Sequence, residues 1–487
     1  SKEKVKGLIE DHHKESIKDN FVSIHFIKAA DLLTHNRLDL SFKLLYLEGK
    51  EKSLNFTSKI YKEHIRALTM GSFNEPSNQE KNNFNKYMLT FNKVFLDIKK
   101  NGFDNSKTLI PLSKNRSIAN GAHRVASAIY LNKNVSCVYC DVDDHIYDYK
   151  FFLKRKVPNN ILDIGVSKFI EYTNNVYLAF IWPSAKGRDK EIDKIIPKIL
   201  YKKNIRLNYN GAQNLLTQIY YNESWLGNIN DNFKGVKAKL AECFKTFEPI
   251  RVIAFQASNL HEVVKIKEGI RDIFDLGKHS IHITDSKEEA LRCSSMVFND
   301  NSIHFLNHSR PNKYPSTHKK VDAFKAFISD REVCHDDVLL DGSMVLSAYG
   351  IREAKDVDYL KNNNSKFDLQ NDMFERHDSE LKYHDIEKLS LIYNPQYYFY
   401  FNDVKFVSFK QVYKMKKNRN ETKDIADCKM MDGLIDRNPS KILINKCVQF
   451  IDYEKIKLKI NFLKFLRFTN LYTSAKFLQK ILKRKRK

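Results

Sequence analysis

The sequence lacks any apolar run long enough to form a membrane-spanning helix. Its first residues, Ser1 to Val5, are mostly charged, and they are not followed by the apolar core of a signal peptide. We therefore expect a protein that neither crosses a membrane nor is exported by the usual route.

Cysteine is scarce as well. Seven cysteines are scattered over 487 residues, and their odd number and wide spacing argue against a disulfide framework. Cys137 and Cys140 have the spacing of a redox or zinc pair, but they lie in an alternating apolar run that predicts a strand, and no second pair exists. These observations favour a reducing compartment, and we expect a cytoplasmic location.

The chain also contains no internal repeat, low-complexity tract, zinc finger or RNP motif. What it has in excess is positive charge, because 83 Lys and Arg stand against 59 Asp and Glu, for a net charge of +24. Such a surplus attracts anions, which include nucleotides, phosphorylated substrates, nucleic acid and acidic membranes. The basic residues are spread along the chain, so nucleic acid is the less favoured partner.

Local patterns predict a multidomain protein of mixed α/β and α+β class. Apolar residues at helical spacing predict helices at 60–70, 82–101, 120–130, 191–201, 261–270, 288–298 and 344–349. Short apolar runs predict strands at 135–142, 176–181, 251–255, 280–283, 338–340 and 357–360, with a hairpin over 397–409. The polar stretch 308–318 is typical of a linker. We expect domains at 1–165, 170–310 and 320–450, followed by a basic tail at 451–487.

The clearest chemical pattern lies between 341 and 358. Gly342 allows a backbone to approach phosphate closely, and Ser343 at a helix start offers donors to phosphate oxygens. Asp356 and Asp358 alternate along an expected strand, so both carboxylates point to one face. Oxygen ligands beside a phosphate cradle suit Mg²⁺ or Mn²⁺. The alternative is an ordinary strand, turn and helix with two surface aspartates.

This order of Gly-Ser and Asp-x-Asp resembles the nucleotidyltransferase superfamily, and within it the LicD-like proteins that modify bacterial surface polysaccharides. The resemblance implies a third carboxylate on a later strand, for which we select Asp378 over Asp403. It also implies that Arg352, Lys423 and Arg419 bind nucleotide or sugar phosphate. The expected donor is a nucleoside triphosphate or a nucleotide-activated compound.

A second pattern surrounds His282. Residues 270–290 resemble the active-site segment of nucleoside diphosphate kinases, a ferredoxin-like fold in which the histidine is the phosphorylated nucleophile. The resemblance implies that His282 is that nucleophile and that Arg271 binds phosphate, while Trp182 replaces the lysine of the family. A carboxylate, Glu288 or Asp285, is expected to orient the ring. The alternative is a structural histidine that precedes a helix. In this alternative, Thr284 or Asp285 is the N-cap of the helix, and Glu288 completes a capping box.

The N-terminal segment Asn120-Gly-Ala-His-Arg resembles the Asp-Gly-x-His-Arg signature of ParB-like and sulfiredoxin-like domains. The resemblance implies that His123 and Arg124 bind nucleotide phosphates at a helix start. Further ligands are expected among Arg37, Asp39 and Lys43, or from Tyr61 and His64. A purely capping role is the alternative.

Residues 455–487 carry twelve basic and no acidic residues among apolar ones, which suggests an amphipathic helix on the anionic inner face of a membrane. A packed terminal helix is the alternative. Taken together, the resemblances imply a Mg²⁺-dependent phosphotransferase or nucleotidyltransferase in bacterial surface polysaccharide or lipopolysaccharide synthesis, acting on a phosphorylated or sugar-type acceptor. They leave open whether the chain also performs a kinase step. The alternative function is a nucleic-acid-binding or RNA-modifying nucleotidyltransferase.

Overall fold

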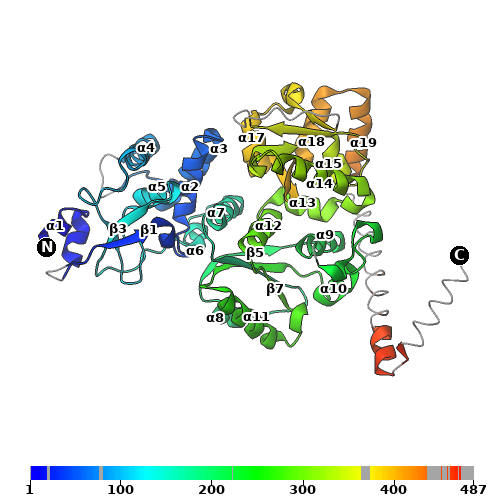
Figure 1. Ribbon diagram of the computed structural model, residues 1–487, viewed down its shortest axis with the longest axis horizontal. Coiled ribbons are helices and arrows are strands. Elements are labelled where there is room, and N and C mark those ends of the chain that lie inside the picture. Colours follow the sequence, from blue (N-terminus) through cyan, green and yellow to red (C-terminus); the bar gives the residue numbers. More distant parts are fainter. Residues whose placement is uncertain are drawn as a thin grey trace, which may run out of the picture.

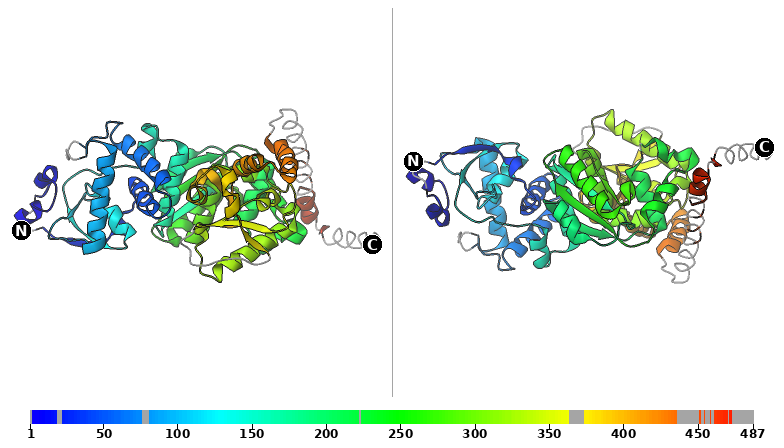
Figure 2. Two further views of the ribbon diagram at one scale, coloured as in Figure 1. Left: turned by 90° about the horizontal axis from the view of Figure 1, so that it is seen from above. Right: turned by 90° about the horizontal axis from the view of Figure 1, so that it is seen from below.

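The computed structural model describes residues 2–18, 22–75, 81–221, 223–362, 373–435, 451, 454, 458, 461–469 and 471–472. These residues form a mixed α/β protein with three separate sheets. The N-terminal segment and the short helix at 461–469 lie at opposite ends of the molecule (Figures 1 and 2). No helix among the described residues is both long and apolar enough to cross a membrane.

The N-terminal region contains a three-stranded sheet in the order β1-β3-β2, in which β3 is antiparallel to β1 and parallel to β2. Its strands are β1 (His25–Lys28), β2 (Ile110–Leu112) and β3 (Asn134–Tyr139). Its helices are α1 (Lys2–Lys6), α2 (Asp39–Gly49), α3 (Leu54–Leu68), α4 (Phe84–Asn101) and α5 (Ala122–Tyr130). Gly102 ends α4 with a φ of +76°, a conformation that glycine adopts without strain.

The middle region contains a four-stranded sheet in the order β5-β6-β4-β7, in which all neighbours are antiparallel. The strands are β4 (Val176–Ile181), β5 (Ile199–Ile205), β6 (Ile250–Gln256) and β7 (Ile281–Ile283). Helices α8 (Asp189–Ile195) and α11 (Leu260–Phe274) pack on one face, whereas α9 (Tyr209–Ile219), α10 (Val236–Cys243) and α12 (Lys287–Val297) lie on the other (Figure 1).

The helix predicted at 191–201 is wrong in its second half. Helix α8 ends at Ile195, and Ile199 already pairs with β6 as the first residue of β5. Pro197 lies between the two elements, and proline cannot donate the backbone hydrogen bond that a continuing helix needs. Because isoleucines at helical spacing also suit a strand, the pattern alone did not separate the two elements.

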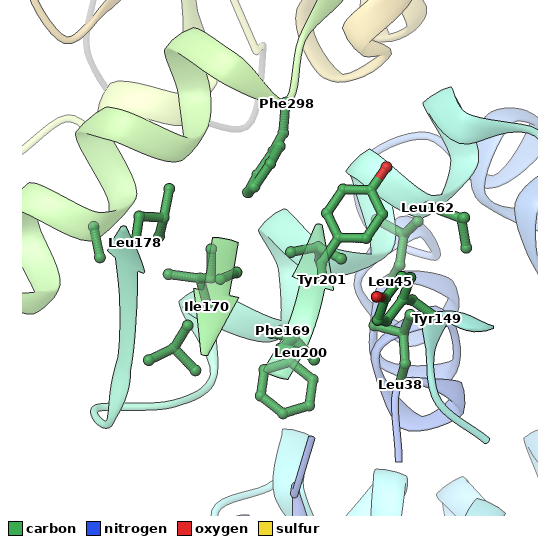
Figure 3. Packing of buried hydrophobic residues seen from close by; sticks show 14 of the residues in the cluster. Leu38, Leu45, Tyr149, Leu162, Phe169, Ile170, Leu178, Leu200, Tyr201 and Phe298 are labelled. Atoms are coloured by element: carbon green, nitrogen blue, oxygen red, sulfur yellow. The ribbon is translucent and has the colours of Figure 1, made fainter. Parts of the chain in front are cut away.

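Helices α6 (Tyr149–Lys154) and α7 (Asn159–Glu171) join the first two regions into one core. Leu162 and Ile170 of α7 belong to the same buried cluster as Leu45 of α2 and Tyr201 of β5 (Figure 3). The boundary expected at 165–170 therefore lies inside a helix whose apolar side chains pack in the core shared by both regions.

The C-terminal region contains a five-stranded mixed sheet in the order β10-β9-β8-β12-β11. The strands are β8 (Val338–Leu340), β9 (Val357–Lys361), β10 (Phe374–Arg376), β11 (Tyr398–Phe401) and β12 (Val404–Val407). The helices are α13 (Asp300–His308), α14 (Pro315–Ser329), α15 (Ser343–Ala348), α16 (Leu381–His384), α17 (Lys388–Tyr393), α18 (Phe409–Arg419) and α19 (Thr422–Ile435). Asn402 and Asp403 have positive φ values of 47° and 63°, which confirms the predicted tight hairpin turn.

The stretch 308–318 is not a linker, because it is built into the C-terminal body. Phe305 of α13 stacks on Phe399 of β11 with ring centroids 4.6 Å apart, and α14 begins at Pro315. Thr317 and His318 are buried. The polar residues that suggested a linker instead form short helical turns and side-chain hydrogen bonds, such as the one between Thr317 and Ser347.

Candidate metal centre and its surroundings

Gly342 lies in the turn between β8 and α15, directly against Asp358. Its φ is +57°, and a Cβ atom at this position would lie 2.5 Å from Oδ2 of Asp358. Any other residue would therefore be strained and would push the carboxylate away. The glycine thus brings the backbone turn within contact of the Asp358 side chain. Helix α15 has only six residues, so its dipole adds little to this turn.

Asp356 and Asp358 alternate at the start of β9 as the sequence pattern predicts. Asp356 is exposed and Asp358 is half-buried. The Ser343 hydroxyl donates to Oδ1 of Asp356 over 3.3 Å, which joins the turn after β8 to the first of the two aspartates. The structure thus brings Gly342, Ser343 and both aspartates to one place.

The third carboxylate at this place is Glu375. It lies on β10, which pairs in parallel with β9, and its register partner is Asp358. One oxygen each from Asp356, Asp358 and Glu375 lie within 4.8 Å of one another. Three carboxylates at this separation offer the oxygen ligands that Mg²⁺ and Mn²⁺ prefer.

Asp378, selected from the sequence as the third carboxylate, is used elsewhere. Its carboxylate pairs with the Arg376 guanidinium at 2.6 Å and with the Lys388 ammonium. These two cations hold its pKa below the usual range although partial burial opposes this shift. The structure thus groups Glu375 instead of Asp378 with Asp356 and Asp358, because the short strand β10 brings Glu375 beside β9.

The Asp358 carboxyl group is both partly buried and close to other carboxylates. Burial raises the pKa of its carboxyl to about 6, and the neighbouring Asp356 and Glu375 add to that shift, while His377 opposes it. A divalent cation between the three carboxylates would relieve this repulsion. The donor set and its charge therefore fit a hard metal ion.

Behind the three carboxylates lies a buried polar triad that the sequence analysis missed. Asp341 is fully buried, and its Oδ2 lies 2.8 Å from both Nδ1 of His377 and Nε2 of His384. Burial would raise the pKa of Asp341, but the two imidazoles outweigh it and hold the pKa well below the usual range. His377 Cε1 lies 3.5 Å from the position of a Cβ on Gly342, so this ring borders the turn.

The cations expected to bind phosphate in this region differ in their ion-pair partners and in their proximity to the three carboxylates. Arg352 forms a two-pronged ion pair with Asp427 of α19, at 2.6 and 2.8 Å, and lies close enough to Asp356 for that charge to raise its pKa further. Arg419 pairs with Asp424 at 2.8 Å and with Glu380 at 3.0 Å. Lys416, which was not among the expected cations, is buried between Asp424 and Asp427. Lys423, in contrast, is exposed and pairs with Glu421 at 3.3 Å at the start of α19. Arg352 is therefore the cation that borders the carboxylates.

His282 lies on β7 and is held by Glu289. Its Nε2 lies 2.9 Å from Oε1 of Glu289, whose second oxygen accepts from the backbone of Asp285. The orienting carboxylate is therefore Glu289 instead of Glu288 or Asp285. The cap of α12 is Ser286, which accepts from the Glu289 backbone, instead of Thr284 or Asp285.

Arg271 lies on the helix that covers the other face of the sheet from His282. Its helix, α11, packs with Ile281 and Ile283, which flank His282 and point to the opposite side. The guanidinium pairs with Glu268 of the same helix at 2.7 Å. Trp182, in the place of the family's lysine, is fully buried in the core. No contact described in the structure joins Arg271 to His282.

His123 and Arg124 point in different directions from α5. The Tyr61 hydroxyl lies 2.8 Å from Nε2 of His123, whose ring packs on Phe91 at 4.5 Å. Burial holds the pKa of His123 well below its usual value. Arg124 instead pairs with Glu10 at 2.5 Å, which ties the N-terminal segment to the sheet. The two residues do not form one phosphate clamp.

Residues near His123 form a second buried polar group. Asp39 accepts from Arg37 at 2.8 Å and from Lys43 at 2.9 Å, and all three side chains are almost fully buried. Nε2 of His64 lies 3.4 Å from the Lys43 ammonium. The residues considered from the sequence as further ligands therefore do gather in one place, but they mainly bind one another.

Comparison with known proteins gives no match. No family model, curated protein or solved structure is significantly similar to this chain.

Proposed function

We propose that the C-terminal region is a divalent-metal-dependent nucleotidyltransferase or phosphotransferase. The observation that supports this proposal most is the meeting of Asp356, Asp358 and Glu375 beside the Gly342-Ser343 turn. In the nucleotidyltransferase superfamily that the sequence resembles, a third carboxylate follows on a later strand, and Glu375 on β10 meets this requirement. The resemblance also makes a nucleoside triphosphate or nucleotide-activated compound the expected donor.

Each residue has a role that its surroundings support. Asp356, Asp358 and Glu375 would hold Mg²⁺ or Mn²⁺, which screens phosphate charge and polarises the phosphorus centre when bound. Gly342 lets the turn after β8 lie against the Asp358 carboxylate, and Ser343 orients Asp356. Arg352, fixed by Asp427, borders the group and supplies positive charge without needing to be ordered on binding. The proposed acceptor is a phosphorylated or sugar-type molecule, as the resemblance implies.

The decisive experiment incubates the full chain and Mg²⁺ with nucleotides labelled at either the α- or the γ-phosphate. We expect label transfer from one of the two positions, which separates nucleotidyl from phosphoryl transfer. Asp356→Asn should abolish transfer while leaving the melting temperature almost unchanged, because Asp356 is exposed. Turnover that persists in this variant would refute the metal role. An RNA acceptor added to the same assay tests the nucleic-acid alternative.

A second activity, phosphorylation of His282, is favoured by one contact. A carboxylate that holds one ring nitrogen fixes the tautomer and leaves the other nitrogen to act as a nucleophile. Glu289 makes this contact at 2.9 Å. The antiparallel strand order β5-β6-β4-β7 agrees with the ferredoxin-like fold that the resemblance to nucleoside diphosphate kinases implies.

We also propose that the basic C-terminal tail contacts the anionic inner face of a membrane. Most of 451–487 lies outside the described residues. Within the described helix at 461–469, Phe462, Phe465 and Phe468 are exposed, whereas Leu466 is buried. Lys464 pairs with Glu242 at 3.5 Å, which attaches this helix to α10. Exposed aromatic residues among basic ones are typical of helices that bind at a membrane surface.

A further inference from the structure

A large cavity lies where all three regions of the protein meet. Its volume is about 890 Å³, which is within the range of small-molecule sites. The lining comes from the α2–α3 corner, from α7, from the end of α9, from α12, and from the β11–β12 hairpin together with α17. Sites between domains are common positions for ligands. None of the functional residues discussed for the metal centre lines this cavity.

The charge of the cavity is opposite to that of the chain. Its lining contains eight carboxylates, from Glu48, Glu171, Glu223, Asp285, Glu288, Glu289, Asp336 and Asp403. Only four Lys and Arg side chains accompany them, from Lys52, Lys168, Arg292 and Lys405. In a protein with a net charge of +24, this is a local reversal. A nucleotide or other phosphate-bearing ligand would be repelled here, whereas a cation would be attracted.

In one half of the cavity, the acidic charge of Glu48, Glu171 and Asp336 is neutralised by lysines. Lys168 lies between Glu48 and Glu171 and pairs with both. Lys405 lies 3.9 Å from Asp336 and donates to backbone carbonyls. This half therefore carries little net charge.

The other half retains an acidic surplus. Glu223, Asp285 and Glu288 form no ion pair with any residue that the structure describes. Burial raises the pKa of Asp285, and the adjacent Glu289 carboxylate raises it further. Glu223 belongs to the same corner, because its charge and that of Glu289 both act on the Tyr220 hydroxyl, whose pKa burial already raises. We call this corner, formed by Glu223, Asp285 and Glu288, the acidic corner.

Aromatic rings form much of the remaining wall. Tyr393, Tyr398 and Tyr400 come from the C-terminal region, and Phe56 and Phe298 come from α3 and the end of α12. The tyrosines already accommodate ammonium groups, because Lys405 lies 5.0 Å from the ring centroid of Tyr398 and 5.3 Å from that of Tyr393. Rings of this kind attract ammonium groups through their π faces and shield the hydrocarbon between them.

We propose that this cavity binds a small aliphatic polyamine. One ammonium group would pair with the acidic corner, and the methylene chain would lie along the aromatic wall. A charged hydrogen bond to carboxylates and contact with aromatic faces together recognise an amine and reject its neutral analogue. Because the lining includes α2, α7, α12 and α17, a bound polyamine would hold the three regions together.

The test is calorimetric titration of the full chain with spermidine and putrescine, beside butanediol as the neutral analogue of putrescine. We expect saturable binding of both amines and none of the diol. The double substitution Glu223→Gln and Glu288→Gln should weaken spermidine binding at least about tenfold, since it removes two charges from the acidic corner. The matched control is Asp272→Asn on α11, an exposed carboxylate outside the cavity.

Each outcome decides the proposal. Absence of amine binding by the wild-type chain would overturn it, as would equal binding of the diol. Equal weakening by Asp272→Asn would show nonspecific attraction of polycations to the surface and would overturn it as well. Melting curves of the double variant establish that it folds. If it does not, Glu288→Gln alone serves as the second variant, since that side chain has no ion pair described in the structure.

Discussion

Glu375 lies directly opposite Asp358 on the neighbouring parallel strand. In a parallel pair, residues in register point to the same face, so this alignment places Glu375 beside Asp358 of β9 and Asp356, which directly precedes that strand. Strand pairing therefore determines the separation of Asp358 and Glu375, whereas Asp356 lies in the bend just before β9. A site held by strands is more rigid than one held by loops, which suits the fixed geometry that Mg²⁺ requires.

The first prediction separates Glu375 from Asp378. Glu375→Gln should remove most of the rise in melting temperature that Mn²⁺ or Mg²⁺ gives the wild-type chain, because a proposed ligand is lost. Asp378→Asn is the matched control and should keep that rise, since Asp378 is engaged with Arg376 and Lys388. Thermal unfolding with and without metal measures both. If Asp378→Asn loses the rise and Glu375→Gln keeps it, Glu375 is not the third ligand.

The second prediction concerns pH and the metal. Because the pKa of Asp358 is raised to about 6, its carboxyl takes up a proton below that pH and stops serving as a ligand. Metal affinity should therefore fall as the pH drops below about 6, by up to about tenfold per pH unit. Titration calorimetry with Mn²⁺ over this range measures the effect.

The same shift has a consequence for stability without metal. A carboxyl whose pKa is raised in the folded state stabilises the protein at low pH, and this stabilisation is lost as the pH rises through the folded pKa, here about 6. In metal-free buffer near neutral pH, Asp358→Asn should therefore be more stable than the wild type, by about 1–3 kcal/mol. Urea unfolding checks this, and a less stable variant would contradict it.

The third prediction is acid sensitivity of the N-terminal region. Burial and the nearby Lys43 hold the pKa of His64 well below normal, and burial with Lys81 and Lys43 does the same for His123, so both are neutral when folded. The unfolded chain takes up protons below about pH 6.5. The free energy of unfolding should therefore decrease as the pH is lowered, by up to about 1.4 kcal/mol per pH unit for each histidine. His123→Gln should make the free energy of unfolding less dependent on pH. An unchanged slope in that variant would show that His123 is charged in the folded state.

The fourth prediction tests phosphorylation of His282. Incubation with γ-labelled ATP should give an acid-labile label that His282→Ala removes and Glu289→Gln strongly reduces, since the contact that fixes the ring is weakened. His279→Ala, which alters a histidine of the preceding turn, is the matched control and should keep the label. Label that persists in His282→Ala would exclude this residue as the nucleophile.

The fifth prediction concerns the C-terminal helix. Phe468→Ser should lower cosedimentation with vesicles that contain an anionic phospholipid, because an exposed apolar side chain is lost from the binding face. Phe26→Ser on β1, also exposed, is the control at the opposite end of the molecule and should have little effect. Equal binding by wild type and Phe468→Ser would leave this face without a membrane role.

Local patterns predicted elements well where one period dominated, as in the hairpin around Asn402 and Asp403 and in strand β4. They failed where isoleucines suited two structures, as at the junction of α8 and β5. Within the candidate site, sequence spacing brought out Gly342, Ser343, Asp356 and Asp358, which are near one another along the chain. It missed Glu375 because β10 has only three residues, which is too short for an alternating pattern to predict a strand.

The buried triad was missed for a related reason. A fully buried aspartate is recognisable only through its partners, and His377 and His384 reach Asp341 from a different segment of the chain. The clue available in the sequence was the pair of histidines seven positions apart among charged residues, which carries no information about the element they face. Tertiary partners of this kind follow from the packing and not from local pattern.

Helix α7 determines how this protein can be dissected. Since Leu162 and Ile170 pack in one core with α2 and β5, separating the chain near residue 168 would expose apolar surface on both fragments. We therefore expect the N-terminal and middle regions to unfold together, so that a substitution that destabilises one also destabilises the other. Fragments meant for separate study should keep residues 22–309 together.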